Sequence, residues 1–299
     1  MLRGNLPAVF AEDQLKVTNW FTLTVGVRFT HFRGTVSEKT TSPGVGSAIR
    51  IPRLKWVLHG FYGRYYQAPP LSTVAGPLLA LAIKQGFDFI PLRGERDEEH
   101  QFGLSIPLRG WIIDTDYFRT GVKNFFDHNA LANSNIFFPL TIERARIRAF
   151  EITARSPLLF GRAQFHLAYS RQKIEGQGAV TGGLTDFSPP ADFFLLDHDQ
   201  RHTLSTGLLV SLPGRAFAST TVRYGSGFLD GGNAPNHLPG HTLIDISFSK
   251  NLGEKWLLAI QAVNLMNHRF LLDNSETFGG THFVEPRQIY VEVKYRFHY

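Results

Sequence analysis

Residues 288–299 (QIYVEVKYRFHY), at the end of the chain, decide the fold class. From Ile289 to Tyr299 every second residue is apolar or aromatic, and the residues between them are mostly polar or charged. A period of two residues places alternate side chains on opposite faces of a β-strand, whereas an amphipathic α-helix has a period of 3.6. This segment therefore predicts a long strand with one apolar face and one polar face.

The same alternation recurs upstream, which extends the prediction to the whole chain. The clearest repeats begin at Phe21, Phe102, Phe165, Leu204, Ala218 and Ile244, and weaker ones occupy residues 10–17, 54–67, 111–123, 145–155 and 255–265. These segments predict about twelve strands and an all-β chain. One short helix is expected at 77–85, inside a loop.

The connections between the expected strands alternate in length. Short turns are expected at 18–20, 107–110, 157–161, 213–214 and 251–254, and long connections at 33–47, 68–98, 124–143, 174–200, 228–239 and 266–286. Tight turns that alternate with long loops are typical of an up-and-down antiparallel transmembrane β-barrel, with short periplasmic turns and long extracellular loops. The alternation fails near Tyr65 unless residues 47–54 form a further short strand. We therefore expect a partial barrel of twelve or thirteen strands.

A soluble β-sandwich would also alternate, and three features favour the membrane barrel instead. The strands run to ten residues or more, close to the ~9–11 that cross a tilted bilayer. Loops of about twenty residues are uncommon in compact soluble domains. Aromatic residues gather near strand ends, as they do in the interfacial girdles of outer-membrane barrels. These residues are Trp20, Trp56, Trp111, Trp256, Tyr224 and Tyr299.

Composition narrows the function classes. The 299 residues include 31 Lys or Arg and 25 Asp or Glu, a formal charge of +6, and no cysteine. The lack of cysteine excludes disulfides, thiolate zinc sites and cysteine nucleophiles. Basic residues are scattered singly along the alternating segments, so we expect no nucleic-acid partner. No segment is typical of a membrane-spanning helix. Residues 1–4 lead directly into patterned sequence, so we expect no signal peptide.

Several motifs, in their order along the chain, resemble the C-terminal barrel region of TonB-dependent outer-membrane receptors. They lie at 62–71 (YGRYYQAPPL), 95–104, 117–124, 197–204 (DHDQRHTL), 263–267 (VNLMN) and 286–290 (PRQIY). In that family the element at 263–267 caps the penultimate strand, and the final strand is the assembly signal read by the outer-membrane insertion machinery. The resemblance assigns that signal to Tyr295, Phe297 and Tyr299. Met266 departs from the family pattern, in which Phe is usual.

The resemblance also implies a function. Receptors of this family are plugged barrels of 22 strands, and this chain resembles only about the last thirteen. We therefore expect residues 1–299 to be the C-terminal portion of such a barrel, without a plug domain, so that TonB acts only through a plug supplied elsewhere. The implied activity is energised uptake of a scarce siderophore, cobalamin, glycan or peptide across the outer membrane of a Gram-negative-type cell. The implied surroundings are outer-membrane lipid and lipopolysaccharide.

The candidate ligand-binding residues are aromatic and polar side chains of the long loops. They are Phe87, Phe89, Phe137, Phe138, Phe193, Phe194, Asn233, Asn236 and His237. We expect no catalytic residue, metal or cofactor. His198 and His202 would lie about 13 Å apart on a strand, too far to share one ion. The acidic run 95–99 is interpreted as an exposed loop rim, and Asp114 and Asp116 as charges that face the lumen.

Two other functions stay open at this point. One is a smaller barrel that acts as a passive pore or as a structural outer-membrane protein. The other is a soluble carbohydrate-binding β protein. Steady conductance in planar bilayers would favour the first, and a product that is soluble without detergent would favour the second.

Overall fold

The computed structural model describes residues 4–34, 36–70, 80, 83–84, 86, 88–130, 137–184, 189–197, 199–231, 234–274 and 281–297. Its strands are β1 (Ala8–Lys16), β2 (Phe21–Arg33), β3 (Ser37–Ile51), β4 (Trp56–Gln67), β5 (Phe89–Ile90), β6 (Glu95–Leu108), β7 (Trp111–Ala130), β8 (Phe137–Arg155), β9 (Ala163–Leu184), β10 (Phe194–Leu195), β11 (His202–Leu212), β12 (Ala216–Gly225), β13 (His241–Leu252), β14 (Trp256–Val263), β15 (Leu271–Asp273), β16 (His282–Phe283) and β17 (Gln288–Tyr295). No helix within these ranges is long and apolar enough to cross a membrane. Most of the helix expected at 77–85 lies outside the described residues.

Thirteen of the strands form the path of one antiparallel, up-and-down sheet. Their order is β1-β2-β3-β4-β6-β7-β8-β9-β11-β12-β13-β14-β17. The short strand β5 pairs with the far end of β9 and β10 pairs with β9 near its middle, while β15 pairs with β16 in a separate two-stranded sheet. The all-β class, the antiparallel order and the expected twelve or thirteen strands are confirmed, with thirteen on the path.

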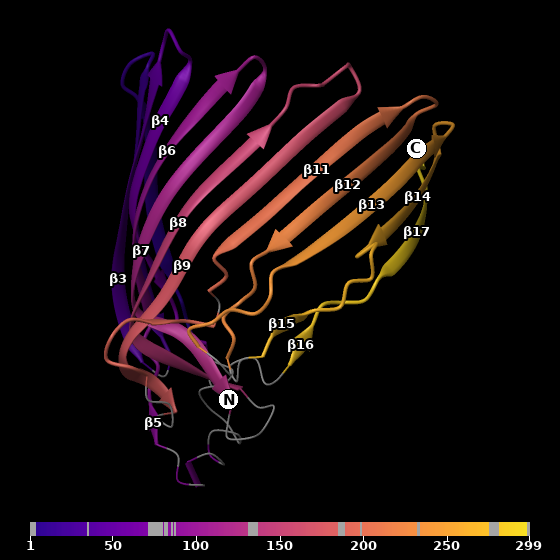
Figure 1. Cartoon of the computed structure of the whole chain (residues 1–299). Coiled ribbons are helices and arrows are strands. Elements are labelled where there is room, and N and C mark those ends of the chain that lie inside the picture. Colours follow the sequence, from indigo (N-terminus) through magenta and orange to yellow (C-terminus); the bar gives the residue numbers. More distant parts are fainter. Residues whose placement is uncertain are drawn as a thin grey trace.

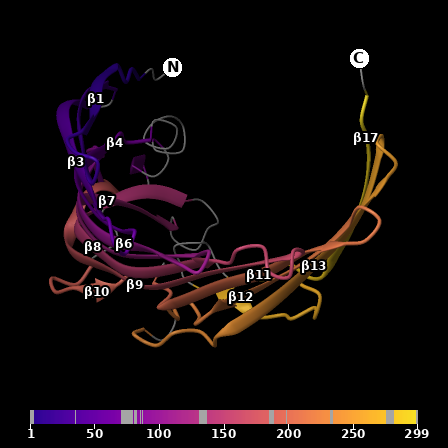
Figure 2. The ribbon, with the colours of Figure 1, turned by 90° about the horizontal axis from the view of Figure 1, so that it is seen from above.

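The sheet is a curved wall. In Figure 1 its tilted strands run side by side, with the short turns along one rim and the long connections along the other. Seen from above, the strands trace an open arc with β1 near one end and β17 near the other (Figure 2). Among the described residues, each of these two edge strands pairs with a single neighbour.

Turn chemistry explains why one rim is tight. Arg109 and Gly110 both have positive φ and join the paired residues Leu108 and Trp111, which is the geometry of a two-residue type I′ hairpin. The five short turns expected from the sequence are present, and a sixth joins β3 to β4 at residues 52–55.

One expected loop is a strand. Residues 33–47, predicted as a long connection, mostly belong to β3, which is 15 residues long and pairs with β2 over its whole first part. Ser, Thr, Gly and Pro occupy most positions there, so neither face is consistently apolar and the alternation rule misses the strand. The short strand expected at 47–54 corresponds to the last five residues of β3, and residues 52–54 lie in the turn to β4.

The long connections are shorter than expected because several strands continue past their apolar segments. β7 reaches Ala130, β8 begins at Phe137 and β9 reaches Leu184. The acidic run 95–99 is likewise part of β6 and not a loop. Glu95 is buried there and accepts a hydrogen bond from Phe126 N at 2.6 Å. These strand ends surround a small core of Val122, Leu140, Ile142, Ala145 and Leu196.

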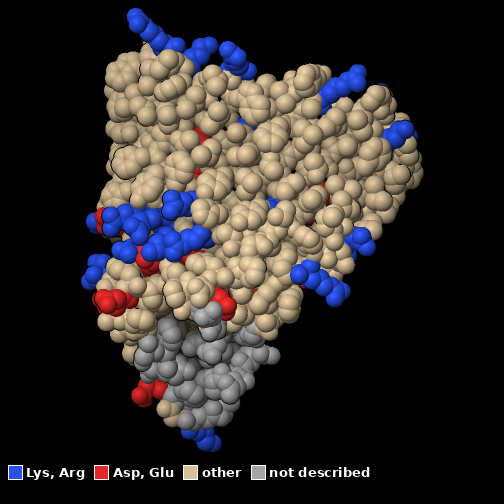
Figure 3. All heavy atoms as spheres, viewed as in Figure 1, with Lys and Arg blue, Asp and Glu red and all other residues tan. Residues whose placement is uncertain are grey.

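Register defines the two faces of the sheet, because directly paired residues of antiparallel strands point to the same side. One row across five strands is mostly apolar and belongs to the outer face: Leu104, Thr115, Ile152, Tyr169 and Leu204. Figure 3 views the convex side. Uncharged side chains cover its middle, while Lys and Arg gather at the rims and in one patch over β8 and β9. This is the distribution that a lipid-facing band requires.

The alternate residues point to the concave side and are polar. His59 Nε2 and Gln101 Nε2 lie 2.8 and 2.9 Å from Asp116 Oδ1. Gly103 pairs with both His59 and Asp116 and leaves room for this contact, since a Cβ there would lie 2.1 Å from His59 Nε2. Asp116 thus sits on the concave polar face, as expected for a charge that faces a lumen.

Candidate functional site

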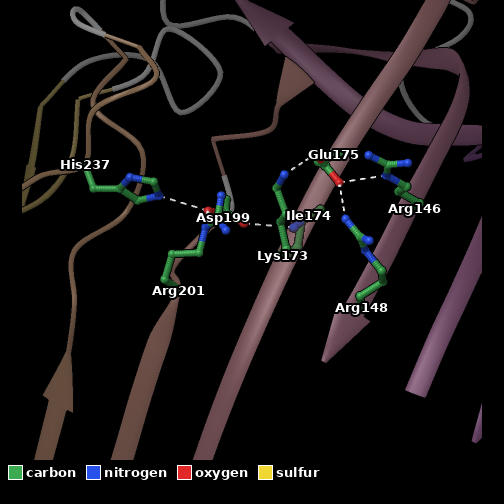
Figure 4. Close-up of polar contacts among 8 residues, drawn as sticks. All are labelled: Arg146, Arg148, Lys173, Ile174, Glu175, Asp199, Arg201 and His237. Atoms are coloured by element: carbon green, nitrogen blue, oxygen red, sulfur yellow. Dashed lines mark hydrogen bonds and ion pairs between the residues drawn. The ribbon is translucent and has the colours of Figure 1, made fainter. Parts of the chain in front are cut away.

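Two buried carboxylates organise the loop end of β8 and β9 (Figure 4). Glu175 belongs to β9, and Asp199 lies in the connection between β10 and β11. Their exposed fractions are 4% and 0%. Burial of a carboxylate is costly unless cations or N–H groups surround it. Glu175 is the thirteenth residue of β9 counted from its short-turn end, beyond the ~9–11 residues that a bilayer covers.

Glu175 is held by cations from two strands. Arg146 Nε and Arg148 Nη2 of β8 donate to Glu175 Oε2 at 2.7 and 3.0 Å, and Lys173 Nζ lies against Oε1. The register brings them together, because Arg146 pairs with Glu175 and Arg148 pairs with Lys173. Burial by itself raises the pKa of Glu175, but the hydrogen bonds and charges of Arg146 and Lys173 outweigh it and lower the pKa to about 2. Glu175 is therefore ionised at physiological pH.

Asp199 pins two connections to the sheet. Its Oδ1 accepts a hydrogen bond from Ile174 N of β9 at 2.8 Å, and its Oδ2 accepts one from Arg201 Nε at 2.7 Å. The same Oδ2 lies 2.9 Å from His237 Nε2, which comes from the connection between β12 and β13. One buried carboxylate therefore fixes the connections on both sides of β11 and β12.

The structure separates the expected ligand-binding residues. The guanidinium carbon of Arg146 lies over the Phe193 ring, 3.7 Å from the ring centroid, whereas Phe194 packs against the small core. The two rings therefore contact different parts of the structure and do not share a site. Phe138 is buried, and the ring of His237 is engaged by Asp199.

The other expected residues are dispersed. Phe89 is half-buried in β5, and Phe137 begins β8. Asn236 is exposed, and its carbonyl oxygen accepts a hydrogen bond from Asp230 N at 2.8 Å. Phe87 and Asn233 lie outside the described residues. A role of these residues in ligand binding stays a prediction.

A pocket of about 500 Å³ opens on the concave side. Its lining includes Glu151, Ser170, Gln200, Ser205, His241 and Phe270. The rings of His241 and Phe270 stack with centroids 4.1 Å apart. Gly225 allows the convergence, since a Cβ there would lie 2.5 Å from His241 Nε2 and 2.6 Å from Gln200 Nε2. Gln200 is buried, and within the described ranges its Nε2 has no hydrogen-bond partner.

Sequence reasoning missed this pocket. Its residues come from separate strands and from the connection after β14, and only the register brings them together. In the described part of the chain, no group of three or more His, Cys, Asp or Glu side chains is placed to hold a metal ion. His202 Nδ1 instead lies 2.8 Å from the Tyr169 hydroxyl, and His198 is outside the described residues.

The motif at 263–267 is a hydrogen-bonded cap at the end of β14. Asn264 is buried, and its Nδ2 donates to the carbonyl oxygens of His268 and Glu285, both at 2.9 Å. Its Oδ1 accepts a hydrogen bond from His268 N at 2.9 Å. Asn267 Oδ1 accepts one from Arg287 N at 3.0 Å, which ties the motif to the segment before β17. The expected capping of the penultimate strand is confirmed.

We expect Asn264→Ala to lower the free energy of unfolding by about 3 kcal/mol, because it leaves several buried backbone groups without partners. The matched control is Asn251→Ala, at a half-buried asparagine of β13, where a change below about 1 kcal/mol is expected. Denaturant titration of the protein extracted from outer membranes into a neutral detergent measures both. Equal effects of the two substitutions would show that the motif is not a cap.

The expected assembly residues lie at the end of the chain. The Tyr295 ring packs against Trp256 and against Phe297, with centroids 4.7 Å apart in each case. Phe297 is largely exposed. Tyr299 is outside the described residues. An aromatic cluster is thus present on the free edge strand, and its role in assembly stays a prediction.

Comparison with known proteins agrees with this architecture. The family model described as "TonB dependent receptor-like, beta-barrel" matches residues 3–265. The FrpB iron transporter from Neisseria meningitidis is similar in fold, with a TM-score of 0.73 and 16% identity over 99% of this chain and 46% of that one. A mutant of the ferric enterobactin receptor from Pseudomonas aeruginosa gives 0.71 and 16% over 98% and 45%. The copper transporter OprC gives 0.72 and 13% over 98% and 48%.

The present chain spans less than half the length of these structures. A search of curated protein sequences found no significant match. At such low identities, the similarity to these structures shows the fold alone. The family model shows the family, because it matches most of the chain. With that match and thirteen consecutive antiparallel strands, the chain belongs to the TonB-dependent receptor-like β-barrel family.

Proposed function

We propose that residues 1–299 form the C-terminal part of an outer-membrane receptor barrel that takes up a scarce ligand by an energised route. The observation that carries this proposal is the open sheet of thirteen strands, apolar outside and polar inside, which is similar in fold to transporters over nearly its whole length. Receptors of this kind close with 22 strands. About nine further strands and a plug, from another segment or another chain, would complete the barrel.

The free edges of β1 and β17 are where we propose that those strands join. Unpaired N–H and C=O groups in hydrocarbon cost several kcal/mol each, so a bilayer does not tolerate an open sheet edge. All residues of β1, and nearly all of β17, are exposed in the isolated arc. In this proposal, TonB acts through the added plug, and the insertion machinery reads the aromatic end of β17.

For the ligand we propose a metal–chelate complex of the siderophore class. The similar structures named above are an iron transporter, a ferric enterobactin receptor and a copper transporter. The concave pocket offers the Gln200 amide donor, the His241 imidazole and the face of Phe270. Few polar groups within a partly aromatic lining suit a polar ligand with aromatic rings. Phe89, Phe137 and Asn236 remain candidates at the outer rim.

Uptake of a radiolabelled ferric catecholate into iron-starved cells tests this function. We expect uptake to stop when the chain is deleted and when a protonophore collapses the proton-motive force. Gln200→Ala should lower the initial rate about tenfold, the effect of one lost hydrogen bond. Gln261→Ala, also on the concave side but on β14, should leave the rate unchanged.

Uptake that persists with the protonophore would contradict energised transport and support the passive pore. Wild-type uptake by the Gln200→Ala variant would remove the pocket from the proposal. The amount of each variant in the outer membrane is measured alongside, so that a change in rate is assigned to binding and not to abundance.

A further inference from the structure

The six short turns of the sheet carry most of the net charge of the chain. These turns, which together form the short-turn rim, are residues 17–20, 52–55, 109–110, 156–162, 213–215 and 253–255. Five of them hold at least one basic residue: Arg53, Lys55, Arg109, Arg162, Arg215 and Lys255. The only acidic residue in the six turns is Glu254. Six cations and one anion give the rim a formal charge of +5, against +6 for the whole chain.

Three of these cations occupy backbone positions that disfavour their side chains. Lys55, Arg109 and Arg215 have φ values of 58°, 50° and 58°. In this left-handed region the Cβ atom crowds the backbone, so glycine fits best and asparagine is tolerated. Outside the short turns, every described residue with positive φ is a glycine or an asparagine. Long cations held in three strained positions of the same rim indicate that their charge has a use.

The rim cations have no anionic partner within the described residues. All six are exposed, and no ion pair joins any of them to a carboxylate there. In Figure 3, Lys and Arg side chains project from the upper rim, beyond the uncharged middle of the convex face. The short-turn rim therefore presents uncompensated positive charge to its surroundings.

Tryptophan marks the same rim. Each of the four tryptophans of the chain ends a short turn or begins the strand that follows one: Trp20, Trp56, Trp111 and Trp256. Trp111 lies four residues before Thr115, which belongs to the outer face, so strand alternation places the Trp111 ring on that face too. Because tryptophan concentrates at the boundary between lipid and water, the cations of the turns stand at the height of lipid headgroups.

Exposed apolar side chains adjoin the cations. At each of the five turns that carry a cation, an exposed leucine lies in the turn or at its edge: Leu54, Leu108, Leu158, Leu212 and Leu252. Phe160, in the turn between β8 and β9, is also exposed. A leucine that reaches the acyl chains beside a cation that reaches the headgroups suits a molecule with both parts.

We propose that the short-turn rim binds anionic glycerophospholipids, with their phosphate groups on the turn cations and their acyl chains on the tryptophans and leucines. Each Lys or Arg near an anionic lipid surface adds to the attraction, and guanidinium groups bind phosphate oxygens through paired hydrogen bonds. An acidic soluble protein could contact the cations but could not reach tryptophans that the bilayer covers. With the long connections outside, as in the function proposed above, this rim lies in the periplasmic leaflet.

Quenching of tryptophan fluorescence by brominated lipids tests the proposal, because bromine quenches only those rings that the acyl chains contact. The barrel is purified from outer membranes with the strands that complete it and is reconstituted in phosphatidylcholine vesicles. The vesicles contain either brominated phosphatidylglycerol, which is anionic, or brominated phosphatidylethanolamine, which is zwitterionic. We expect the tryptophans to prefer the anionic lipid about tenfold, and the preference to shrink as salt is raised.

Lys55→Asn, Arg109→Asn and Arg215→Asn are combined in one rim variant. Asparagine tolerates positive φ, so the turns keep their conformation while three charges are removed. The preference for phosphatidylglycerol should fall to about twofold or less, and the melting temperature should not fall. Any tryptophans of the added strands are the same in both proteins, so the difference belongs to this chain.

The matched control removes three exposed cations far from the short turns, toward the long-connection ends of β3 and β7. It combines Lys39→Asn, Arg119→Asn and Lys123→Asn, and the lipid preference at the tryptophans should stay as in the wild type. An equal loss of preference in this control would overturn the proposal, as would an unchanged preference in the rim variant.

The unaltered protein provides a test that does not depend on how the variants fold. Equal quenching by the two brominated lipids in the wild type would overturn the proposal. None of these measurements involves uptake or the orientation of the barrel in the cell. Failure of the lipid site and failure of the proposed uptake are therefore told apart.

Discussion

Arginine in place of Ile260 is expected to lower the free energy of unfolding in a lipid bilayer by about 2–4 kcal/mol. Arginine in place of its neighbour Gln261 is expected to change it by less than about 1 kcal/mol. The two substitutions add the same side chain, one position apart, to the same strand. Their difference therefore measures which face of the sheet meets lipid.

The expectation follows from the register of β14. Ile260 pairs with Phe248 and Val291 and is about half exposed on the outer face. It is the fifth residue of β14 from its short-turn end, close to the middle of the bilayer. Gln261 pairs with Ser247 and Tyr290 on the concave side, where a charged group meets water or polar side chains.

Urea titration of the barrel purified from outer membranes with the strands that complete it, reconstituted in lipid vesicles and followed by tryptophan fluorescence, measures both variants. Equal losses would contradict a lipid-facing outer side. A larger loss for Gln261→Arg would mean that the two faces are assigned the wrong way round. The wild-type midpoint in the same vesicles serves as the reference.

The second large effect is expected at Asp199. Asp199→Ala should destabilise the protein by about 3–5 kcal/mol, because it leaves Arg201, His237 and the Ile174 N–H without their shared acceptor. The damage should be local first. Hydrogen exchange should accelerate in residues 194–201 and 226–240, while exchange in the strands near the short-turn rim stays unchanged.

Asp192→Ala is the matched control, since Asp192 is an exposed acid in the neighbouring connection, between β9 and β10. A change below about 0.5 kcal/mol and no change in exchange are expected for it. If Asp199→Ala left the exchange of both connections as slow as in the wild type, Asp199 would not be the residue that pins them. Gln200, which lines the concave pocket, lies next to Asp199 in the connection between β10 and β11. Uptake by the Asp199→Ala variant should therefore fall as hydrogen exchange in that connection accelerates.

The fold could be predicted from the sequence wherever one face of a strand is continuously apolar. Residues 289–297 and the strand that begins at Phe21 show this, and most of the short turns followed from Pro and Gly between such strands. β3 could not be found in the same way, because SEKTTSPG offers no apolar face and its pairing with β2 is what makes it a strand. The lengths of the connections were overestimated for the same reason.

The sites were harder to predict because they depend on register. The basic residues look singly scattered along the sequence, yet Arg119, Arg148 and Lys173 become direct neighbours once β7, β8 and β9 pair. Likewise, Phe193 and Phe194 are neighbours in the sequence, but Phe193 contacts Arg146 whereas Phe194 packs against the small core. The motif at 263–267 was predictable, because the contacts of the Asn264 side chain are with His268, close in sequence, and with Glu285 in the segment before β17.

Cysteine labelling in intact cells tests the central claim most directly, because the chain has no cysteine of its own. Asp192→Cys places one thiol in a long connection, and Phe160→Cys places one in a short turn, where Phe160 is 98% exposed. An outer-membrane barrel with long loops outside predicts that a membrane-impermeant maleimide labels the thiol at 192 in intact cells. The thiol at 160 should be labelled only after the outer membrane is permeabilised. Equal labelling of both thiols in intact cells, or the reverse order, would contradict the orientation on which the proposed uptake depends.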